Sequence, residues 1–461
     1  MIIKYYDGKK RYIYKSKTIN RFQDLFEKVF SVHNKKNFFN RDSKAMIFAI
    51  KAWQYSSKIF SSFFSNVKIF EQSHLICIKN STVRTKSNTL PISGLVFKKK
   101  LFSKEKVIVT NNVVNEKYLY FRKNYYSPDV YLTTFKDCFF YTNINFIFEP
   151  NSNNIYTDNT NYNDFVFPEE VDRRKISTLF SERKMDSRFC KSKSLILDNV
   201  FYINSRLDVN YSHWLIESFP KIVLYYSKRE NFKVPLIISS NVHKNCLALI
   251  RSFNTEIKII IASPYLKIIS KKIYHITPVA DIPFNYRSND SLIRNHFKVN
   301  TFTQKPFLKT REALLKNKEM LSFKNKYSDS CIYLRRKSNY RLIINELDII
   351  KINRKHGLKI IDPISLSIVE QIAMFYFCKT IITPSGSALA NLIFSGPNLN
   401  LVYIASNNKS HGYHFYPRLA SVANPSIKIY QFLGEITQRV HSSYSVDIEE
   451  YEQFLVNNSL L

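Results

Sequence analysis

Short uncharged β runs alternate with amphipathic helical segments from residue 196 onward, and this alternation constrains the fold more than any other feature. Expected strands are LILDNVFYIN, VPLIIS and IKIIIAS, then SCIYLRRK, LKIIDP, TIITP and LNLVYIAS; expected helices include YSHWLIESFPKIVLYYSK (interrupted near Pro220), VHKNCLALIRSF, NELDIIKINRKHG, SLSIVEQIAMFYFC and ALANLIFSG. Uncharged strands alternating with helices are typical of parallel sheets covered on both faces. The sequence therefore predicts an α/β fold with two Rossmann-like halves, joined by a basic connection at 285–330. We expect the active site at the carboxyl ends of the strands.

The first 200 residues have a different texture. Residues 1–95 mix helical-looking segments (19–32 and 43–64) with basic loops. Residues 96–200 contain short β-rich runs between Asn/Asp/Ser clusters. We therefore predict a basic helical extension over 1–95, a β-rich segment leading into the first Rossmann-like domain over 96–300, and the second domain over 301–461.

The charge of the chain is large and uneven. Its 461 residues hold 69 Lys+Arg and 36 Asp+Glu, a formal net charge of +33. Residues 1–100 hold 21 basic and 5 acidic residues, hence 21 − 5 = +16. Such a segment suits an anionic surface such as phospholipid, acidic glycan or nucleic acid, and a solvated lysine-rich face is the alternative. A hydrophobic content of 45% excludes wholesale disorder.

The sequence offers few signs of secretion or of a disulfide framework. No run reaches the roughly 18 apolar residues of a membrane-spanning helix, and the start MIIKYYDGKKRYIYK has no apolar secretory region. We expect a cytoplasmic protein, soluble or peripheral on the inner face of the plasma membrane. Six separated cysteines without a CxxC pair favour buried, reduced thiols: Cys77, Cys138, Cys190, Cys246, Cys331 and Cys378.

The first motif that can carry chemistry is NYSHWLIE at 210–217, which follows a strand and opens a helix. His213 and Glu217 are four residues apart and so share a helix face. An imidazole beside a carboxylate can act as general base with an orienting partner. The alternative is an ordinary helix start in which Asn210 caps and Trp214 packs.

The second motif is YLRRKSNYRLIINE at 333–346, in which Arg335, Arg336 and Arg341 follow a strand. Forked cationic groups near a helix N-terminus suit a phosphate ligand. Asn345 can be the N-cap of the next helix, which starts near Glu346. An exposed basic loop is the alternative.

The third motif is PSGSALAN at 384–391, a strand-to-helix turn that holds one of only seven glycines. Gly386 permits positive φ or a close backbone approach, and the helix start offers free N–H groups to an anion. Ser385 and Ser387 add hydroxyl groups, and Asn391 lies one turn into the helix. The turn fits neither a Walker loop nor GxGxxG.

Other catalytic patterns are missing from the sequence. It contains no Asp-x-Asp, the usual carboxylate pair for a metal–diphosphate. His411 and His414 in HGYH have no nearby Cys or acidic residue, which argues against a metal site there. We expect no metal and no cofactor.

Taken in order, the three motifs resemble glycosyltransferase family 61 across about residues 195–405. The third motif departs from many members, which have His where this chain has Ser385, so any role of that His is lost here. The resemblance implies a GT-B fold whose two Rossmann-like domains face a cleft, the first on the acceptor side and the second on the donor side. It also implies an inverting transfer from a nucleotide-sugar, with UDP as the family default, and no obligatory metal.

The resemblance assigns roles to the candidate residues. His213 is expected to be the base with Glu217 orienting it, and Asp208 is a reserve. The diphosphate is expected to bind the arginines and the Ser385–Ser387 turn. Asn345, Glu346 and Asn391 are expected on the donor side. Asn210 and Trp214 are expected to be structural or to lie on the acceptor side. The expected acceptor is a glycan or glycolipid of the cell surface, such as capsular polysaccharide or lipopolysaccharide, with residues 1–95 on anionic membrane or an acidic acceptor.

Two other kinds of function remain open at this point. Aromatic residues interleaved with Lys, as in KYYDGKKRYIYK, can stack bases, although no nucleic-acid-binding motif accompanies them and we expect no nucleic-acid partner. A non-catalytic glycan-binding relative is the other possibility.

Overall fold

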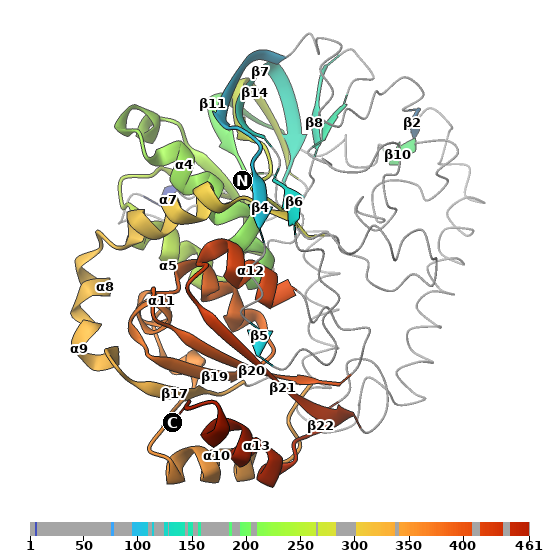
Figure 1. Cartoon of the computed structure of the whole chain (residues 1–461). Helices are drawn as coiled ribbons and strands as arrows, with labels where there is room; N and C mark the ends of the chain where they lie inside the picture. Colours follow the sequence, from blue (N-terminus) through green and yellow to red (C-terminus); the bar gives the residue numbers. More distant parts are fainter. Residues whose placement is uncertain are drawn as a thin grey trace, which may run out of the picture.

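The computed structural model describes the following parts of the chain: 5–6, 75–77, 95–108, 113–114, 124–127, 129–142, 146–150, 155–157, 184–186, 194–203, 210–263, 266–282, 301–336, 341–407, 415–436 and 443–460. They form a mixed α/β structure built on two large sheets (Figure 1). The expected helices at 19–32 and 43–64, Asp208, His411 and His414 lie outside the described residues.

The first sheet has a parallel centre and an antiparallel flank. Its order is β1 (Tyr5–Tyr6), β13 (Ile259–Ala262), β12 (Leu236–Ser239), β11 (Ser194–Tyr202), β14 (Lys267–Ile276), β7 (Val130–Tyr141), β8 (Phe146–Phe148) and β9 (Ile155–Thr157), with β3 (Leu95–Phe102) also on β7. β13, β12, β11 and β14 are parallel to one another, and β7 is antiparallel to β14.

The second sheet is mostly parallel. Its order is β18 (Lys359–Ile361), β17 (Cys331–Leu334), β19 (Thr380–Pro384), β20 (Asn400–Ser406), β21 (Lys428–Ile436) and β22 (Tyr444–Ser445), with β5 (Val113–Val114) also on β21. The strands from β18 to β21 are parallel. Three short ladders hold the remaining strands of the described residues: β10 (Lys184–Asp186) with β2 (Leu75–Cys77), β15 (Ala280–Asp281) with β16 (Thr301–Phe302), and β4 (Lys106–Ile108) with β6 (Asn124–Tyr126).

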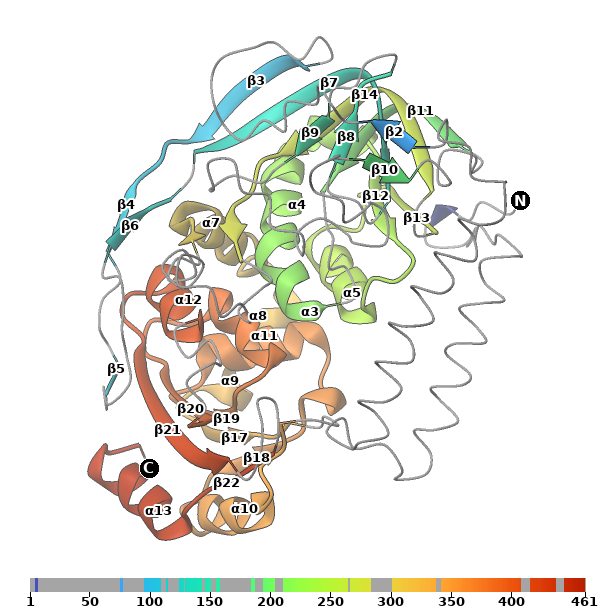
Figure 2. The same cartoon turned by 90° about the vertical axis from the view of Figure 1, so that its right-hand side faces the viewer.

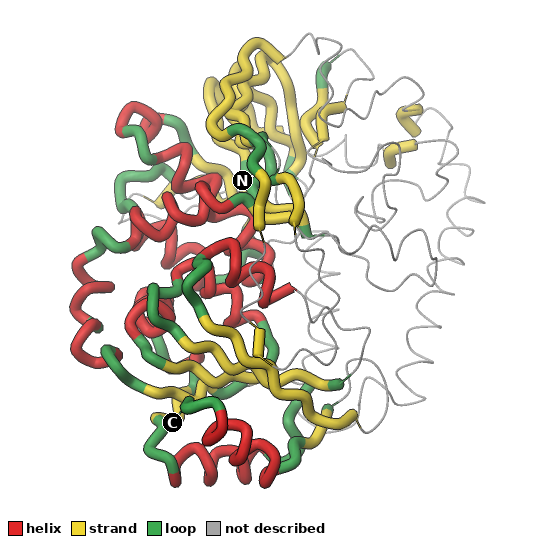
Figure 3. The backbone as a smooth tube through the Cα atoms, in the orientation of Figure 1, coloured by secondary structure: helices red, strands yellow, loops and turns green. Residues whose placement is uncertain are grey.

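Helices fill the space between the two sheets (Figures 1 and 3). Beside the first sheet lie α3 (Tyr211–His213), η3 (Trp214–Ser218), α4 (Phe219–Tyr226), η4 (Arg229–Lys233), α5 (Lys244–Phe253) and α7 (Gln304–Leu314). Beside the second lie α11 (Ile368–Phe377), η6 (Ser387–Phe394) and α12 (Phe415–Ala423), with α10 (Glu346–Lys355) and α13 (Ile448–Asn457) on its far face. The layers therefore run sheet, helices, helices, sheet, helices.

Strand residues alternate between the two faces of each sheet, and both faces are buried. In β11, Phe201 belongs to the core between the sheets, whereas Val200 packs on the opposite face. In β19, Ile381 belongs to the same central core and Ile382 packs toward α10 and α13. Burial on both faces explains why these strands read as continuous apolar runs.

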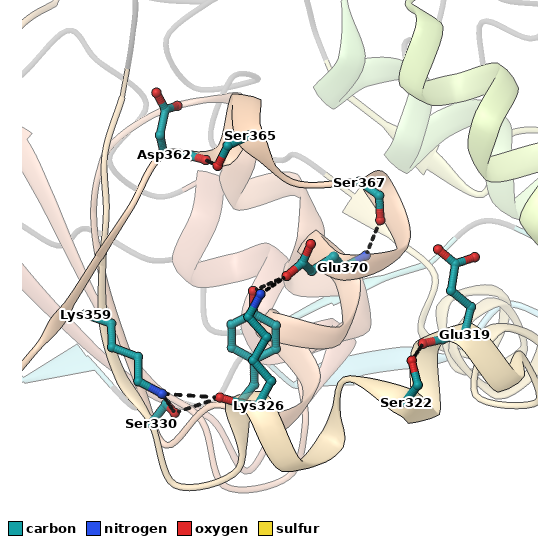
Figure 4. Close-up of polar contacts among 10 residues, drawn as sticks. Glu319, Ser322, Lys326, Ser330, Lys359, Asp362, Ser365, Ser367 and Glu370 are labelled. Carbon is teal, nitrogen blue, oxygen red and sulfur yellow. Dashed lines mark hydrogen bonds and ion pairs between the residues drawn. The ribbon is translucent and has the colours of Figure 1, made fainter.

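The connection between the sheets is helical and anchored to the second sheet's helices. It contains α7, α8 (Lys318–Ser322) and α9 (Lys324–Tyr327). Glu370 Oε1 in the first turn of α11 accepts hydrogen bonds from Lys326 Nζ at 2.6 Å and from the Tyr327 hydroxyl at 2.8 Å (Figure 4). Ser367 Oγ accepts from the Glu370 backbone N–H at 3.1 Å, so the residue that anchors the connection is itself fixed by the helix cap.

The alternation of strands and helices predicted after residue 196 is confirmed. Within the β-rich segment expected at 96–200, β7 is one long strand from Val130 to Tyr141. The sequence interpretation missed β14, which carries Lys271 and Lys272 in its middle, and did not extend to α12, β21 and α13. Of the thiols, Cys138, Cys246 and Cys378 are buried and reduced, as expected, and Cys331 is reduced and partly buried. No helix among the described residues is long and apolar enough to cross a membrane.

Candidate active site

The first motif opens the helix that follows β11. Asn210 is the N-cap of α3, and its Oδ1 accepts from the backbone N–H groups of Ser212 at 3.0 Å and His213 at 3.4 Å. His213 Nδ1 lies 3.0 Å from Glu217 Oε1, and the two side chains are 17% and 21% exposed. The helix start therefore has both features: the Asn210 cap that was the alternative interpretation, and the pair of His213 with Glu217.

A π-helical turn, η3 (Trp214–Ser218), contains Glu217 and joins α3 to α4. The Phe219 N–H bonds the Trp214 carbonyl, a five-residue step, and Pro220 follows in the first turn of α4. This is the interruption expected near Pro220, and π turns occur often at functional sites. Trp214 is fully buried and stacks on Phe219 at 5.7 Å between ring centroids, which is the packing role anticipated for it.

The second motif places Arg335 against acidic and aromatic partners. Arg335 Nη2 donates to Glu346 Oε2 at 2.9 Å, and the Tyr333 hydroxyl donates to Glu346 Oε1 at 3.3 Å. The hydrogen bond to Glu346 raises the pKa of the Arg335 guanidinium. Glu346 therefore holds the arginine, and its carboxylate would repel a phosphate brought directly against it.

Asn345 occupies the N-cap position of α10 but makes no side-chain cap. Its Nδ2 donates to the Val446 carbonyl at 2.7 Å, and its Oδ1 accepts from the Val446 N–H at 3.0 Å. This amide therefore ties the second motif to the segment after β22. Arg341 adopts a φ of 56°, in the left-handed region.

The third motif follows β19, and Gly386 serves a close approach. Its φ is −174°, ordinary extended backbone, so the positive φ that its position suggested does not occur. A Cβ at Gly386 would lie 3.2 Å from Arg336 Cδ and 3.3 Å from Arg336 Nε. Arg336 Nη1 donates to the Ser385 carbonyl, and the Tyr416 hydroxyl donates to the Gly386 carbonyl at 2.8 Å. Glycine lets the Arg336 side chain lie flat against this turn.

The first and third motifs meet through a buried hydrogen bond. The Tyr211 hydroxyl donates to Asn391 Oδ1 at 2.7 Å, and Asn391 is fully buried. Burial raises the pKa of the Tyr211 phenol well above its usual value, so the hydroxyl stays protonated. Asn391 Nδ2 has no hydrogen-bond partner among the described residues. The sequence interpretation singled out Asn391 but not Tyr211, whose aromatic character in the motif was the available signal.

All three motifs therefore converge between the sheets. Tyr211 joins the first motif to the third, and Arg336 joins the second to the third. Phe219 and Phe394 add an edge-to-face ring contact at 6.5 Å between α4 and η6. In Figure 2, α3 lies where the helices of the two sheets meet. Ser385 and Ser387 flank Gly386 at the carboxyl end of β19, the expected location in a parallel sheet.

The described residues offer no constellation for a metal ion. No group of three or more His, Cys, Asp or Glu side chains with suitable placement occurs among them. Whether sugar transfer needs a metal can be decided only by the reaction itself, so independence from metal stays a prediction.

The comparison with known protein families agrees with this arrangement. Residues 211–403 match the family described as Glycosyltransferase 61, close to the span expected from the motifs. The match begins at Tyr211, contains all three motifs after Asn210 and ends in β20. No curated protein matches the chain. Residues 211–403 are therefore similar to glycosyltransferase family 61, and this match supports glycosyltransferase activity.

Proposed function

We propose that the protein is an inverting, metal-independent transferase with a GT-B arrangement. It moves a sugar from a nucleotide-sugar, a UDP-sugar by family default, to a surface-glycan acceptor such as capsular polysaccharide or lipopolysaccharide. The two parallel-centred sheets with helices between them support the GT-B arrangement. The single observation that carries the proposal is the His213–Glu217 pair beside a buried junction of all three motifs.

The pair supports a general-base role for His213. An ionised carboxylate only accepts hydrogen bonds, so Glu217 selects the tautomer with the proton on Nδ1. Nε2 is then left with a lone pair that can take the proton of an acceptor hydroxyl. A single inverting displacement needs one such base, and Glu217 fixes the ring that supplies it. Asp208 is the alternative candidate for the base.

The leaving diphosphate requires positive charge where no metal supplies it. Arg336 lies flat against Gly386 and bonds the Ser385 carbonyl, which places its guanidinium at the turn where η6 begins. Arg335 is held by Glu346 and is 33% exposed, which leaves part of its fork free for an anion. We assign the diphosphate to Arg335, Arg336 and the turn at Ser385–Ser387, with Arg341 as a further cation.

The cellular setting is part of the proposal. The enzyme works in the cytoplasm, on the inner face of the plasma membrane, with residues 1–95 as one basic contact. Its substrates are the nucleotide-sugar and a glycan or glycolipid acceptor, and nucleic acid is not a partner.

The test combines transfer with donor binding. Release of UDP from a panel of UDP-sugars is measured with oligosaccharide acceptors in EDTA, for wild type, His213→Ala and Glu217→Ala. We expect both variants to lose most transfer while retaining nucleotide binding. Near-wild-type rates in both would reject the assigned base, and donor binding without turnover in wild type would favour a non-catalytic glycan-binding protein.

A further inference from the structure

A lysine–tyrosine ribbon lies on one flank of the molecule, away from the three motifs. We define it as Lys98, Lys99, Lys100, Lys104 and Lys106 with Phe97, Tyr126 and Tyr131. All five lysines are exposed, as are Phe97 (49%) and Tyr126 (65%). They belong to β3, the turn after it, β4 and β6, which follow one another along this flank, and Tyr131 belongs to the adjacent β7 (Figure 2).

The lysines and tyrosines of the ribbon are interleaved in space. Lys98 Nζ lies 4.1 Å from the centre of the Tyr131 ring, and Lys100 Nζ lies 5.6 Å from it. Lys104 Nζ lies 5.6 Å from the Tyr126 ring, and Lys106 is the cross-strand partner of Tyr126. The ammonium groups are thus held near aromatic rings and stay accessible to solvent.

Acidic residues do not cancel this charge. Within 95–108 and 124–136 the acidic residues are Glu105 and Asp129. Glu105 pairs with Lys305 at 2.9 Å, and Asp129 pairs with Lys100 at 3.5 Å and accepts from the Lys104 backbone N–H at 2.6 Å. The ribbon remains strongly positive.

Protection of a free strand edge explains only part of this pattern. Lysine on an edge strand discourages pairing with another chain, which suits Lys98, Lys99 and Lys100. It does not explain Lys104, which lies in the turn after β3, and exposed Phe97 and Tyr126 work against it. Positive charge together with exposed aromatic rings fits a partner whose outer layer is anionic and whose next layer is apolar.

We propose that this ribbon docks the enzyme on an anionic phospholipid bilayer, with the lysines at the headgroups and Phe97 and Tyr126 at the interface. An acidic glycan is the weaker match, because the two carboxylates beside the ribbon, Glu105 and Asp129, are already paired with Lys305 and Lys100 rather than free to bind sugar hydroxyls. The proposal deepens the membrane setting of the proposed function and adds a contact outside residues 1–95.

The experiment is co-sedimentation of the full chain with phosphatidylglycerol–phosphatidylcholine vesicles and with phosphatidylcholine vesicles alone. The test variant is Lys98→Gln/Lys100→Gln/Lys104→Gln/Lys106→Gln. The control is Lys244→Gln/Lys316→Gln/Lys318→Gln/Lys324→Gln, which removes the same charge from exposed positions elsewhere. Since each lysine near an anionic surface contributes about a five-fold gain in partitioning, the test variant should lose binding by roughly several hundred-fold. A further variant, Phe97→Ser/Tyr126→Ser, should weaken binding without changing the charge.

Nucleotide-induced thermal shift of the same variants separates this proposal from the catalytic one, because the ribbon variants should keep the wild-type response. Unchanged vesicle binding in the test variant, or an equal loss in the control, would overturn the docking surface. Ribbon-dependent binding to polygalacturonate without binding to anionic vesicles would overturn it in favour of an acidic glycan.

Discussion

The Tyr211 hydroxyl donates a 2.7 Å hydrogen bond to Asn391 Oδ1, and the two residues are 180 positions apart in the chain. Tyr211 opens the helix that carries His213, whereas Asn391 lies in η6 just after the turn that receives Arg336. The bond therefore couples the position of the proposed base to the proposed diphosphate site. Because a hydroxyl donor occupies Oδ1, it also fixes which way the Asn391 amide nitrogen points.

Replacement of Tyr211 by Phe should disturb both stability and catalysis. The change leaves Asn391 Oδ1 buried without its donor, which should lower the free energy of unfolding by about 1–3 kcal/mol. Urea denaturation and the transfer rate measure the two effects. Tyr226→Phe is the matched control, because it removes a buried hydroxyl that donates to the Val234 carbonyl at 2.8 Å, and both residues lie outside the three motifs. A similar stability loss with unchanged transfer in both variants would contradict a positioning role for Tyr211.

The His213–Glu217 pair predicts a graded loss of rate. His213→Ala should lower kcat by about 10²–10⁴-fold, the usual contribution of a general base. Glu217→Gln keeps a side chain of the same shape but removes the charge that stabilises the developing imidazolium, so its loss should be smaller. Steady-state kinetics with saturating donor tests both, and equal, minor losses would indicate that another group, such as Asp208, takes the proton.

Gly386 offers a steric test of the arginine site. A methyl group there would lie 3.2 Å from Arg336 Cδ, so Gly386→Ala should displace the guanidinium while the fold survives. Loss of one charge-assisted hydrogen bond corresponds to roughly a ten-fold rise in nucleotide Kd or more. Gly357→Ala is the control: φ is +75° and the space is open, so stability should fall with no change in Kd. Calorimetric titration distinguishes the two, and a wild-type Kd in Gly386→Ala would remove Arg336 from the site.

The motifs and the alternation of elements could be predicted, because buried parallel strands leave uncharged runs in the sequence. β14 escaped because Lys271 and Lys272 lie in an exposed part of the strand and break such a run. The sequence predicted that position 386 has no room for a side chain. It could not say whether the cause is a positive φ or a close neighbour, because only the packing of Arg336 decides this. The partners of Asn345 and Asn391 lie 101 and 180 residues away, and no local pattern specifies such pairs.

Buried thiols and phenols predict loss of stability at alkaline pH. Burial raises the pKa of Cys138 to about 12 and that of Tyr226 above its usual value. The unfolded chain releases these protons at lower pH than the folded chain, so the stabilisation is complete below the unfolded pKa and declines as the pH rises toward the folded one. The free energy of unfolding should therefore fall between about pH 9 and pH 12. Cys138→Ala should reduce that slope in urea denaturation across this range, and an unchanged slope would contradict burial of an un-ionised thiol.

In the proposed site, the arginines and the Gly386 turn bind a nucleoside diphosphate without metal. The most direct measurement is a thermal-shift screen of the full chain against UDP, GDP and dTDP in EDTA, with CMP as a monophosphate comparison and Arg336→Ala in parallel. Ligand at about 100-fold excess over Kd stabilises the native state by about 2.7 kcal/mol, which is readily detected. We predict that one nucleotide stabilises wild type and His213→Ala in EDTA but not Arg336→Ala. Stabilisation that requires a divalent metal, or no response to any nucleotide, would contradict metal-independent binding at this site.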